Sequence, residues 1–290
     1  MKLETVDYLA DDAAEQFVRS LRETGFGVLK NHPIPKELVE SIYENWYQFF
    51  ISEEKENFHF NVETQDGYFP PSVSEVAKGH TVKDIKEYFH VYPWGQIPDQ
   101  LKEQILDYYQ RANTFAQELL GWVEAHAPKE VQEKFSIALS EMINGSEQTL
   151  LRVLHYPPMQ GDEEPGAIRA AAHEDINLIT ILVAAEGGGL ELLDRDGKWL
   201  AIDTDPENLI VDAGDMLARI TNDVIPATTH RVVNPSGPNV SRYSIPFFMH
   251  PHPDAMLSCI ESCKEERVKY PDIRADDFLR ERLEEIGLTG

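Results

Sequence analysis

The spacing of apolar residues along the first half of the chain predicts a mainly helical region. Apolar side chains recur every three or four residues over 11–24, from Pro35 to about residue 50, and over 98–126. This spacing places them on one face of a helix. Gly25 follows the first segment and is a typical helix stop. A further helix is expected over 129–143.

Short apolar runs interrupt these helices and predict strands. The runs cover residues 26–29 and 87–94. Residues 60–82 contain several Gly and Pro residues, so they predict a long loop.

From about residue 148 the pattern changes to short apolar runs separated by Gly, Pro, Asn and Asp. A succession of such runs predicts a β-sandwich or a double-sheet barrel. The expected strands cover 149–156, 177–184, 189–193, 198–203, 208–212, 215–221, 228–233 and 241–248. An amphipathic helix is expected over 274–286. We therefore expect one domain, with a mainly helical part at 1–147, a β core at 148–250 and a helical tail at 251–290.

The charge of the chain narrows the range of partners. Its 51 acidic and 26 basic residues give a net charge of −25. Such a field repels phosphate backbones and anionic lipid surfaces, so neither nucleic acid nor membrane is an expected partner. No apolar stretch approaches the roughly 20 residues that span a bilayer, and the N-terminal segment has no apolar signal core. A cytoplasmic location is expected.

Cysteine usage excludes two further classes. The two cysteines, Cys259 and Cys263, do not form a disulfide framework, and two thiols alone do not make a closed zinc site. We expect them to be structurally incidental, with a redox pair as the alternative.

A candidate metal site begins at His173-Glu174-Asp175, directly before a strand-like run. In extended chain, residues i and i+2 point to the same face, so His173 and Asp175 can reach one cation while Glu174 points away. His230, in a later strand-like segment, supplies a third ligand. Two imidazoles and one carboxylate form the facial triad that leaves positions open on Fe(II).

A candidate anion site follows this triad along the chain. Arg242 and Ser244 share one face of a predicted strand, and their guanidinium and hydroxyl groups can bind a carboxylate. The apolar run 245–248 comes next, so Arg242 is expected to be buried. A buried arginine requires an anionic partner, although a plain surface ion pair remains the alternative.

These motifs stand in the order found in a known family. The chain resembles the isopenicillin N synthase-like branch of the 2-oxoglutarate/Fe(II)-dependent dioxygenases. The matching segments are 25–34, 84–89, 151–158, 173–182, 189–191, 214–215, 221–222, 230–232 and 242–248. The resemblance implies an α+β, mainly β fold: a double-stranded β-helix (jelly-roll) core at 148–250, a helical N-terminal half and a C-terminal helix, in one oxygenase domain over 1–290.

The resemblance also implies roles for individual residues. His173, Asp175 and His230 would ligate Fe(II). Arg242 would pair with the distal carboxylate of 2-oxoglutarate, and Ser244 would hydrogen-bond to it. Tyr156 matches a family tyrosine that touches this co-substrate.

One position departs from the family pattern. Some plant members have Asn two residues before the tyrosine, where this chain has Leu154. A packed core tyrosine is therefore the alternative for Tyr156. The implied reaction consumes 2-oxoglutarate and O₂, releases succinate and CO₂, and hydroxylates or desaturates a small molecule. Ring closure would use the same residues.

The substrate is less well defined by the sequence. Strand alternation puts Arg152 on the same face as Tyr156, so a second pocket arginine could bind an anionic substrate, with an ion pair to a neighbouring acid as the alternative. Further pocket candidates are Tyr68, Phe69 and His90. We expect Arg219, which lies in an apolar run, to pair with an acid. His250 and His252 are expected in a turn after the last core strand.

Three alternatives stay open. One is an oxidase of the same fold that uses no 2-oxoglutarate, in which Arg242 and Ser244 hold a substrate carboxylate. Another is a non-catalytic jelly-roll protein that senses a metal or metabolite. The third is a zinc hydrolase, which needs a base beside the metal. The sequence leaves the substrate, the pathway and the oligomeric state undetermined.

Overall fold

The fold was analysed in a computed structural model of the 290-residue chain. The structure describes residues 3–73, 83–126, 138–161, 163–164, 166–184, 188–202, 205–234, 238–259 and 268–285. Three long helices of the N-terminal half are present as predicted: α1 (Ala13–Thr24), α2 (Lys36–Ile51) and α3 (Asp99–Ala125).

Gly25 ends helix α1 and lets the following turn pack closely against the segment that contains Thr228. Gly25 has a left-handed φ of 74° and donates its N–H to the carbonyl of Leu21, a geometry that favours glycine. A Cβ on Gly25 would lie 2.3 Å from Oγ1 of Thr228. The absence of a side chain therefore lets this turn pack against the segment that leads into His230.

Nine of the described strands form one large sheet, in which only β1 and β2 run parallel. Its order is β1 (Thr5–Asp7), β2 (Phe26–Lys30), β10 (Leu209–Ala213), β7 (Ile179–Val183), β13 (Phe247–Met249), β5 (Leu150–Tyr156), β4 (Glu87–Val91) and β3 (Gly67–Phe69), with β12 (Arg242–Ser244) also paired to β5.

Four strands form a smaller sheet that faces the large one. Its order is β6 (Ala170–His173), β11 (His230–Val232), β8 (Leu190–Leu193) and β9 (Trp199–Ala201). Apolar residues of both sheets meet in one buried cluster, for example Val28 and Ile210 with Leu192 and Val232. Two facing antiparallel sheets make up the double-stranded β-helix, so the predicted α+β fold with a jelly-roll core is confirmed.

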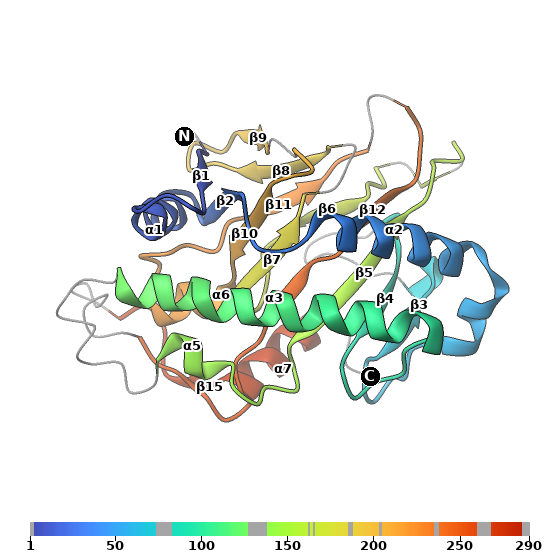
Figure 1. Ribbon diagram of the computed structural model, residues 1–290. Coiled ribbons are helices and arrows are strands. Elements are labelled where there is room, and N and C mark those ends of the chain that lie inside the picture. Colours follow the sequence, from blue (N-terminus) through green and yellow to red (C-terminus); the bar gives the residue numbers. More distant parts are fainter. Residues whose placement is uncertain are drawn as a thin grey trace.

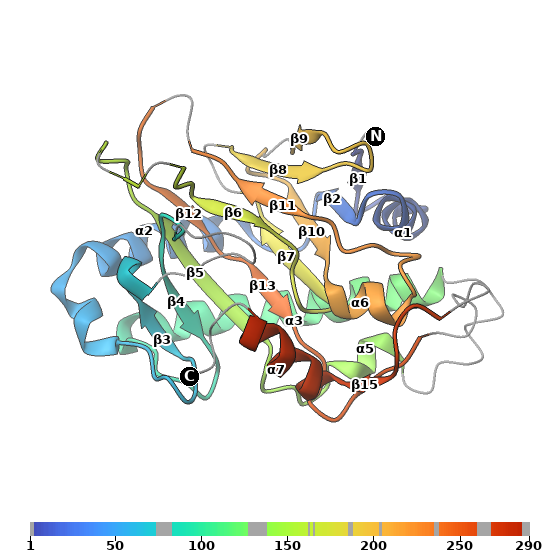
Figure 2. The same ribbon diagram turned by 180° about the vertical axis from the view of Figure 1, so that it is seen from behind.

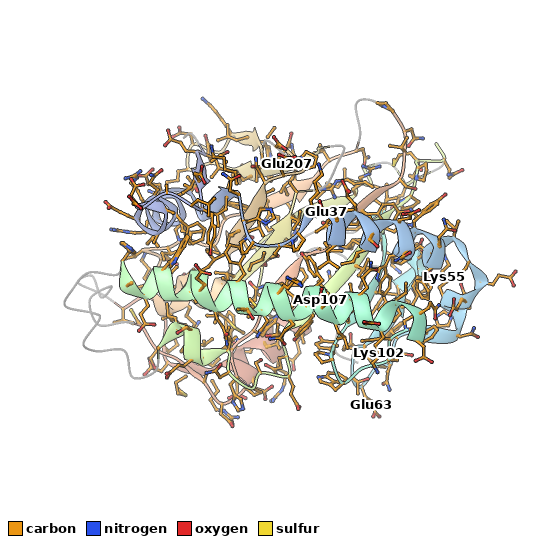
Figure 3. The ribbon with its side chains drawn as sticks, viewed as in Figure 1. Glu37, Lys55, Glu63, Lys102, Asp107 and Glu207 are labelled. Atoms are coloured by element: carbon orange, nitrogen blue, oxygen red, sulfur yellow. The ribbon has the colours of Figure 1, made fainter. Side chains whose placement is uncertain are left out.

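Helices α1, α2 and α3 cover the outer face of the large sheet, and the small sheet covers part of the inner face. Helix α3 runs across this outer face in Figure 1. Trp46 of α2 packs edge-on against Phe89 of β4 at 5.1 Å, and Tyr109 of α3 packs against Phe247 of β13 at 4.8 Å. Charged residues such as Glu37 and Asp107 cover the solvent side of these helices (Figure 3).

The remaining elements are short, apart from the C-terminal helix. They are α5 (Leu139–Met142), α6 (Asp215–Ile220), α7 (Ala275–Glu285), the 3-10 helices η1 (Glu53–Phe58) and η2 (Pro71–Val73), and the strand pair β14 (Met256–Leu257) and β15 (Ile273–Arg274). Helix α7 lies on the side of the large sheet opposite α3, near one end of β5 (Figure 2). Among the described helices, none combines the length and the apolarity needed to cross a membrane.

Several predicted elements differ from the structure. The prediction of a strand over 215–221 is wrong. This segment forms helix α6, whose N-cap residue is Gly214. Its apolar residues are buried nearly all round, so they show no helical period. Pro246 divides the expected strand 241–248 into β12 and β13. The expected loop 60–82 contains β3 and η2.

Other elements were not predicted or lie only partly in the described residues. Strand β6 was not predicted, because its run of three alanines has low strand propensity. Of the helix expected over 129–143, only α5 lies in the described residues, and 127–137 lie outside them. Cys259 is buried, whereas Cys263 lies outside the described residues.

Candidate active site

The structure brings the three predicted metal ligands together at one end of the small sheet. His173 ends β6, His230 begins β11, and the two are register partners. Nε2 of each histidine lies 3.8 Å from Oδ1 of Asp175. One ligand atom from each of the three residues lies within 4.8 Å of the others. This donor set suits Fe(II) and leaves one side of the ion open.

Backbone carbonyls orient both imidazoles. Nδ1 of His173 lies 2.7 Å from the carbonyl of Ala171, and Nδ1 of His230 lies 3.1 Å from that of Thr228. When Nδ1 carries the proton and donates it to the carbonyl, Nε2 is left as the ligand atom. Burial, with a smaller effect of His173, lowers the pKa of His230 to about 4. The neutral imidazole that binds metal is therefore the form present at pH 7.

The carboxylate of Asp175 is also held in place. The hydroxyl of Thr180 donates a hydrogen bond to its Oδ2, and Nδ2 of Asn177 donates to the Thr180 hydroxyl at 2.9 Å. Such outer hydrogen bonds fix the direction in which a ligand carboxylate points. Asp175 is thus positioned by Thr180 of β7, which is held in turn by Asn177 just before that strand.

Negative charge gathers around the triad. Oδ2 of Asp212 lies 3.3 Å from Nδ1 of His230. Burial and the charge of Asp175 raise the pKa of Asp212 well above its usual range. Burial and the neighbouring Glu174 raise the pKa of Asp215 to about 7. The raised pKa values reflect the crowding of carboxyl groups here, and a bound cation would stabilise their charged forms.

Glu174 stays outside the group of ligand atoms, in agreement with the prediction that it points away from the cation, but it lines the neighbouring cavity. It is exposed, accepts a hydrogen bond of 2.9 Å from the Thr229 hydroxyl, and lines the rim of the cavity next to the triad. It is not part of the three-residue group that converges on one point.

A cavity of about 440 Å³ opens beside His173 and Asp175. Its walls come from the inner face of the large sheet and from helix α7, which contributes Leu279 and Arg282. His250 also lines it, and burial lowers the pKa of His250 to about 4. The volume is within the range of small-molecule sites.

The predicted co-substrate residues lie together, further along the inner face of the large sheet. Arg242 pairs with Tyr156, and Ser244 pairs with Leu154, in the ladder between β12 and β5. Arg242, Ser244 and Tyr156 are buried, and none of them lines the cavity beside the triad. The Arg242 guanidinium lies 5.1 Å from the centre of the Tyr156 ring.

The hydrogen bonding of Arg242 tests whether these residues fit the co-substrate. Within the described part of the chain, Nε and Nη1 of Arg242 have no hydrogen-bond partner although both are buried. Unpaired buried donors on a cation are costly unless an anion receives them. The residues therefore fit a carboxylate such as the distal one of 2-oxoglutarate.

Two of the four candidate substrate residues line the cavity. His90 and Arg152 are register partners on β4 and β5, and Nε of Arg152 lies 2.9 Å from Nε2 of His90. The Arg152 guanidinium also stacks 4.5 Å from the Tyr88 ring. These contacts present a fixed cation at the wall of the cavity.

Another candidate, Tyr68, does not line the cavity. Its hydroxyl bonds to Glu87 at 2.5 Å on the outer face of the sheet, and the side chain packs under the helices. Strand alternation in β3 turns the neighbouring Phe69 inward instead, where it contacts His90 at 4.4 Å.

Two further expectations concerned Arg219 and His252. Arg219 forms no ion pair with a described carboxylate. It donates to the carbonyl of Pro271 at 2.5 Å and stacks on the rings of Tyr270 and Phe278. The expected acid partner is therefore replaced by a carbonyl and two aromatic faces. His252 lies in the turn that was expected there, since its Nδ1 accepts the N–H of Asp254.

Some residues of the site were not identified from the sequence. Thr180 and Asp212 carry no motif of their own, and their roles depend on contacts across the sheet. Arg169 directly precedes the three alanines of β6 and is buried. The sequence feature that could have identified Arg169 is a single charged residue next to a run of small residues.

Two family models match the chain. The model described as "2OG-Fe(II) oxygenase superfamily" matches residues 147–251, and "non-haem dioxygenase in morphine synthesis N-terminal" matches residues 3–113. Together they span most of the chain. The first covers the β core with the triad, and the second covers the helical half.

Individual proteins agree with these matches. A 2-oxoglutarate-Fe(II) type oxidoreductase of Emericella nidulans, hxnY, is 30% identical over 94% of this chain and 86% of its own length. The crystal structure of an oxygenase from Shewanella oneidensis is 56% identical, with a TM-score of 0.86 over 99% of both chains. A full-length Neurospora crassa protein crystallised with alpha-KG, another name for 2-oxoglutarate, is 25% identical, with a TM-score of 0.82 over 97% and 96% of the two chains.

The chain belongs to the 2OG-Fe(II) oxygenase superfamily. It is a 2-oxoglutarate/Fe(II)-dependent dioxygenase, so the prediction of an oxidoreductase that uses Fe(II), 2-oxoglutarate and O₂ is confirmed. The resemblance to the isopenicillin N synthase-like proteins is confirmed with it.

Proposed function

We propose that this dioxygenase oxidises a small anionic molecule, that His173, Asp175 and His230 hold its Fe(II), and that Arg242 anchors 2-oxoglutarate. One observation carries the proposal. A convergent group of two imidazoles and a carboxylate shares the inner surface with the buried guanidinium of Arg242, whose Nε and Nη1 have no hydrogen-bond partner among the described residues. Metal and co-substrate need these two features together, because the co-substrate must reach the metal at one end and a cation at the other.

When bound, Fe(II) and 2-oxoglutarate supply the oxidising power, with O₂ as oxidant and with succinate and CO₂ as products. The protein's own residues do the positioning. Carbonyls of the chain hold both imidazoles with Nε2 outward, and Thr180 holds Asp175. Arg242 fixes one end of the co-substrate, with Ser244 and Tyr156 beside it, so that the other end is oriented.

The anionic character of the substrate is inferred from Arg152. Its guanidinium is held by His90 and stacked on Tyr88, and it lines the same cavity as His173 and Asp175. Phe248 provides an apolar wall on the same cavity. A small molecule with a carboxylate or a similar anionic group matches this combination of a fixed cation and aromatic surface.

The proposal treats residues 1–290 as a single oxygenase domain. The N-terminal helices pack on the outer face of the same sheet whose inner face carries Arg152 and Arg242. Strand β4, from the N-terminal half, directly contributes His90 to the cavity. The site therefore requires both halves of the chain.

The test is an anaerobic titration of Fe(II)-loaded protein with 2-oxoglutarate, followed by the weak visible charge-transfer band of bidentate chelation. We expect the band in the wild type and its loss in Arg242→Ala at the same co-substrate concentration. Arg274→Ala is the control, because Arg274 is exposed and pairs with Asp254. Iron binding without a band in the wild type would refute the co-substrate site, and no iron binding would refute the triad.

A further inference from the structure

Two arginines are buried close to each other on the inner surface, and they come from different sheets. Arg169 precedes β6 of the small sheet and is 3% exposed, whereas Arg242 begins β12 of the large sheet and is 4% exposed. Their guanidinium groups lie 5.9 Å and 5.1 Å from the centre of the same ring, that of Tyr156. The ring thus lies next to two positive charges.

The hydrogen-bonding capacity of this pair is largely unused. Nη2 of Arg169 donates to the carbonyl of Val240 at 2.9 Å. Nε of Arg169 and both Nε and Nη1 of Arg242 are buried, and none has a partner within the described residues. The described carboxylates form no ion pair with either arginine.

Burying two like charges without an anion is unfavourable. Burial lowers the pKa of Arg169, and the charge of Arg242 lowers it further. The face of the Tyr156 ring offsets only part of the cost of burying these two cations, because a cation–π contact is weaker than an ion pair with a carboxylate. A carboxylate offers four lone-pair positions on two oxygens, so it can accept hydrogen bonds from both arginines at once.

We propose that Arg169 is a second anchor of the co-substrate, and that it binds the distal carboxylate of 2-oxoglutarate jointly with Arg242. The inference rests on the proposed function, which assigns that carboxylate to Arg242. It adds that the anchor bridges the two sheets, because Arg169 directly precedes strand β6 of the small sheet and Arg242 begins strand β12 of the large sheet.

This arrangement has a consequence for co-substrate choice. A 2-oxo acid without a distal carboxylate would leave two buried cations unpaired instead of one. The enzyme is therefore expected to reject such acids strongly, as sites with unsatisfied buried polar groups do. The relevant comparison ligand is 2-oxopentanoate, which has the same carbon chain as 2-oxoglutarate but no distal carboxylate.

The experiment measures the affinity of anaerobic, Fe(II)-loaded protein for 2-oxoglutarate and for 2-oxopentanoate by calorimetry. In Arg169→Gln we expect the affinity for 2-oxoglutarate to fall by roughly 10- to 100-fold. The affinity for 2-oxopentanoate is expected to stay unchanged. Arg219→Gln is the matched control, since Arg219 also donates to a carbonyl and stacks on aromatic rings, and both affinities should be retained.

Two results would overturn the inference. One is unchanged 2-oxoglutarate binding in Arg169→Gln. The other is an equal loss for both ligands, which would show that Arg169 supports the fold through Val240 rather than binding the carboxylate. Arg169→Lys keeps the charge and is measured in the same way if the Gln variant does not fold. A wild type that binds no 2-oxoglutarate would refute the proposed function itself, whereas binding lost in Arg242→Gln and kept in Arg169→Gln would refute only the second anchor.

Discussion

Arg152 donates a hydrogen bond of 2.9 Å from its Nε to Nε2 of His90, its register partner on the neighbouring strand. Because Nε2 of His90 accepts this bond, the ring proton is on Nδ1, which lies 2.8 Å from the carbonyl of Gln65. The direction of the Arg152 guanidinium is therefore determined by a loop carbonyl, two hydrogen bonds away.

Replacing His90 by Ala should misplace Arg152 without touching the co-substrate. We expect the KM for an anionic substrate to rise by about tenfold, the effect of one lost hydrogen bond to a charged group, with an unchanged Kd for 2-oxoglutarate. The measurement is substrate-stimulated release of succinate over a panel of small carboxylic acids. His59→Ala is the control, since His59 is exposed and pairs with Glu56. Equal KM values in His90→Ala and wild type would exclude the positioning role.

The hydroxyl of Thr180 should matter for metal affinity. Thr180→Val keeps the shape of the side chain and removes the donor to Asp175. We expect Fe(II) affinity to fall by roughly 10- to 100-fold, as for other outer-shell partners of metal ligands. Thr229→Val removes a similar donor, but to Glu174, and should bind Fe(II) as the wild type does. The idea fails if both variants give the same Fe(II) dissociation constant in a competition titration.

Glu87 should make the stability of the protein dependent on pH. It is buried on the outer face of the large sheet and accepts hydrogen bonds from His155, Tyr68 and Lys55, of which Lys55 is labelled in Figure 3. Burial raises the pKa of Glu87, but these three hydrogen bonds lower it more, so its pKa lies below the ordinary 4.5. The unfolded chain therefore binds the proton more readily than the folded one.

The stabilisation from Glu87 is fully present above the unfolded pKa and is lost as the pH falls through the folded pKa. In urea unfolding we expect Glu87→Gln to lose about 2 kcal/mol at pH 7 and to show a flatter decline in stability below about pH 4.5. Glu118→Gln serves for comparison, because Glu118 accepts from the exposed Tyr8 hydroxyl and should change stability by less than about 0.5 kcal/mol. If the free energy of unfolding depends on pH in the same way in wild type and Glu87→Gln, Glu87 is not the source of the pH dependence.

Gly214 should be intolerant of any side chain. A Cβ there would lie 2.2 Å from the carbonyl oxygen of Asn177, in the segment that follows Asp175. We expect Gly214→Ala to lower the free energy of unfolding by about 1–3 kcal/mol or more and to weaken Fe(II) binding. Gly121→Ala should instead stabilise by about 0.5–1 kcal/mol, because Gly121 lies inside α3 with open space around it. Calorimetric unfolding of both variants decides the matter.

The sequence predicted the elements whose period is clear. Helices α1, α2 and α3 expose one polar face, so their spacing is readable, and the strands of the β core have turn residues between them. Helix α6 was misread because burial on nearly all sides removes the helical period. Strand β6 was missed because alanines pack well there without marking a strand.

The site was predictable where chemistry is carried by residue type and spacing. His173, Asp175 and His230 could be named because few residue sets can form a facial triad. Tyr68 and Phe69 could not be told apart because their segment was expected to be a loop, and only strand β3 shows which of the two side chains faces inward. Arg169 and Thr180 act through neighbours that are distant in the sequence, so only the folded chain shows what they contact.

The residues proposed to select the substrate and those proposed to run the oxidation lie on different strands. His90 and Arg152 belong to β4 and β5, whereas the triad belongs to β6, β11 and the segment between β6 and β7. Mutations at His90 and Arg152 can therefore alter which molecule is admitted while the triad and the co-substrate anchor stay unchanged. This separation favours functional diversification. Substitutions at one wall of the cavity can change the substrate while the metal ligands are retained.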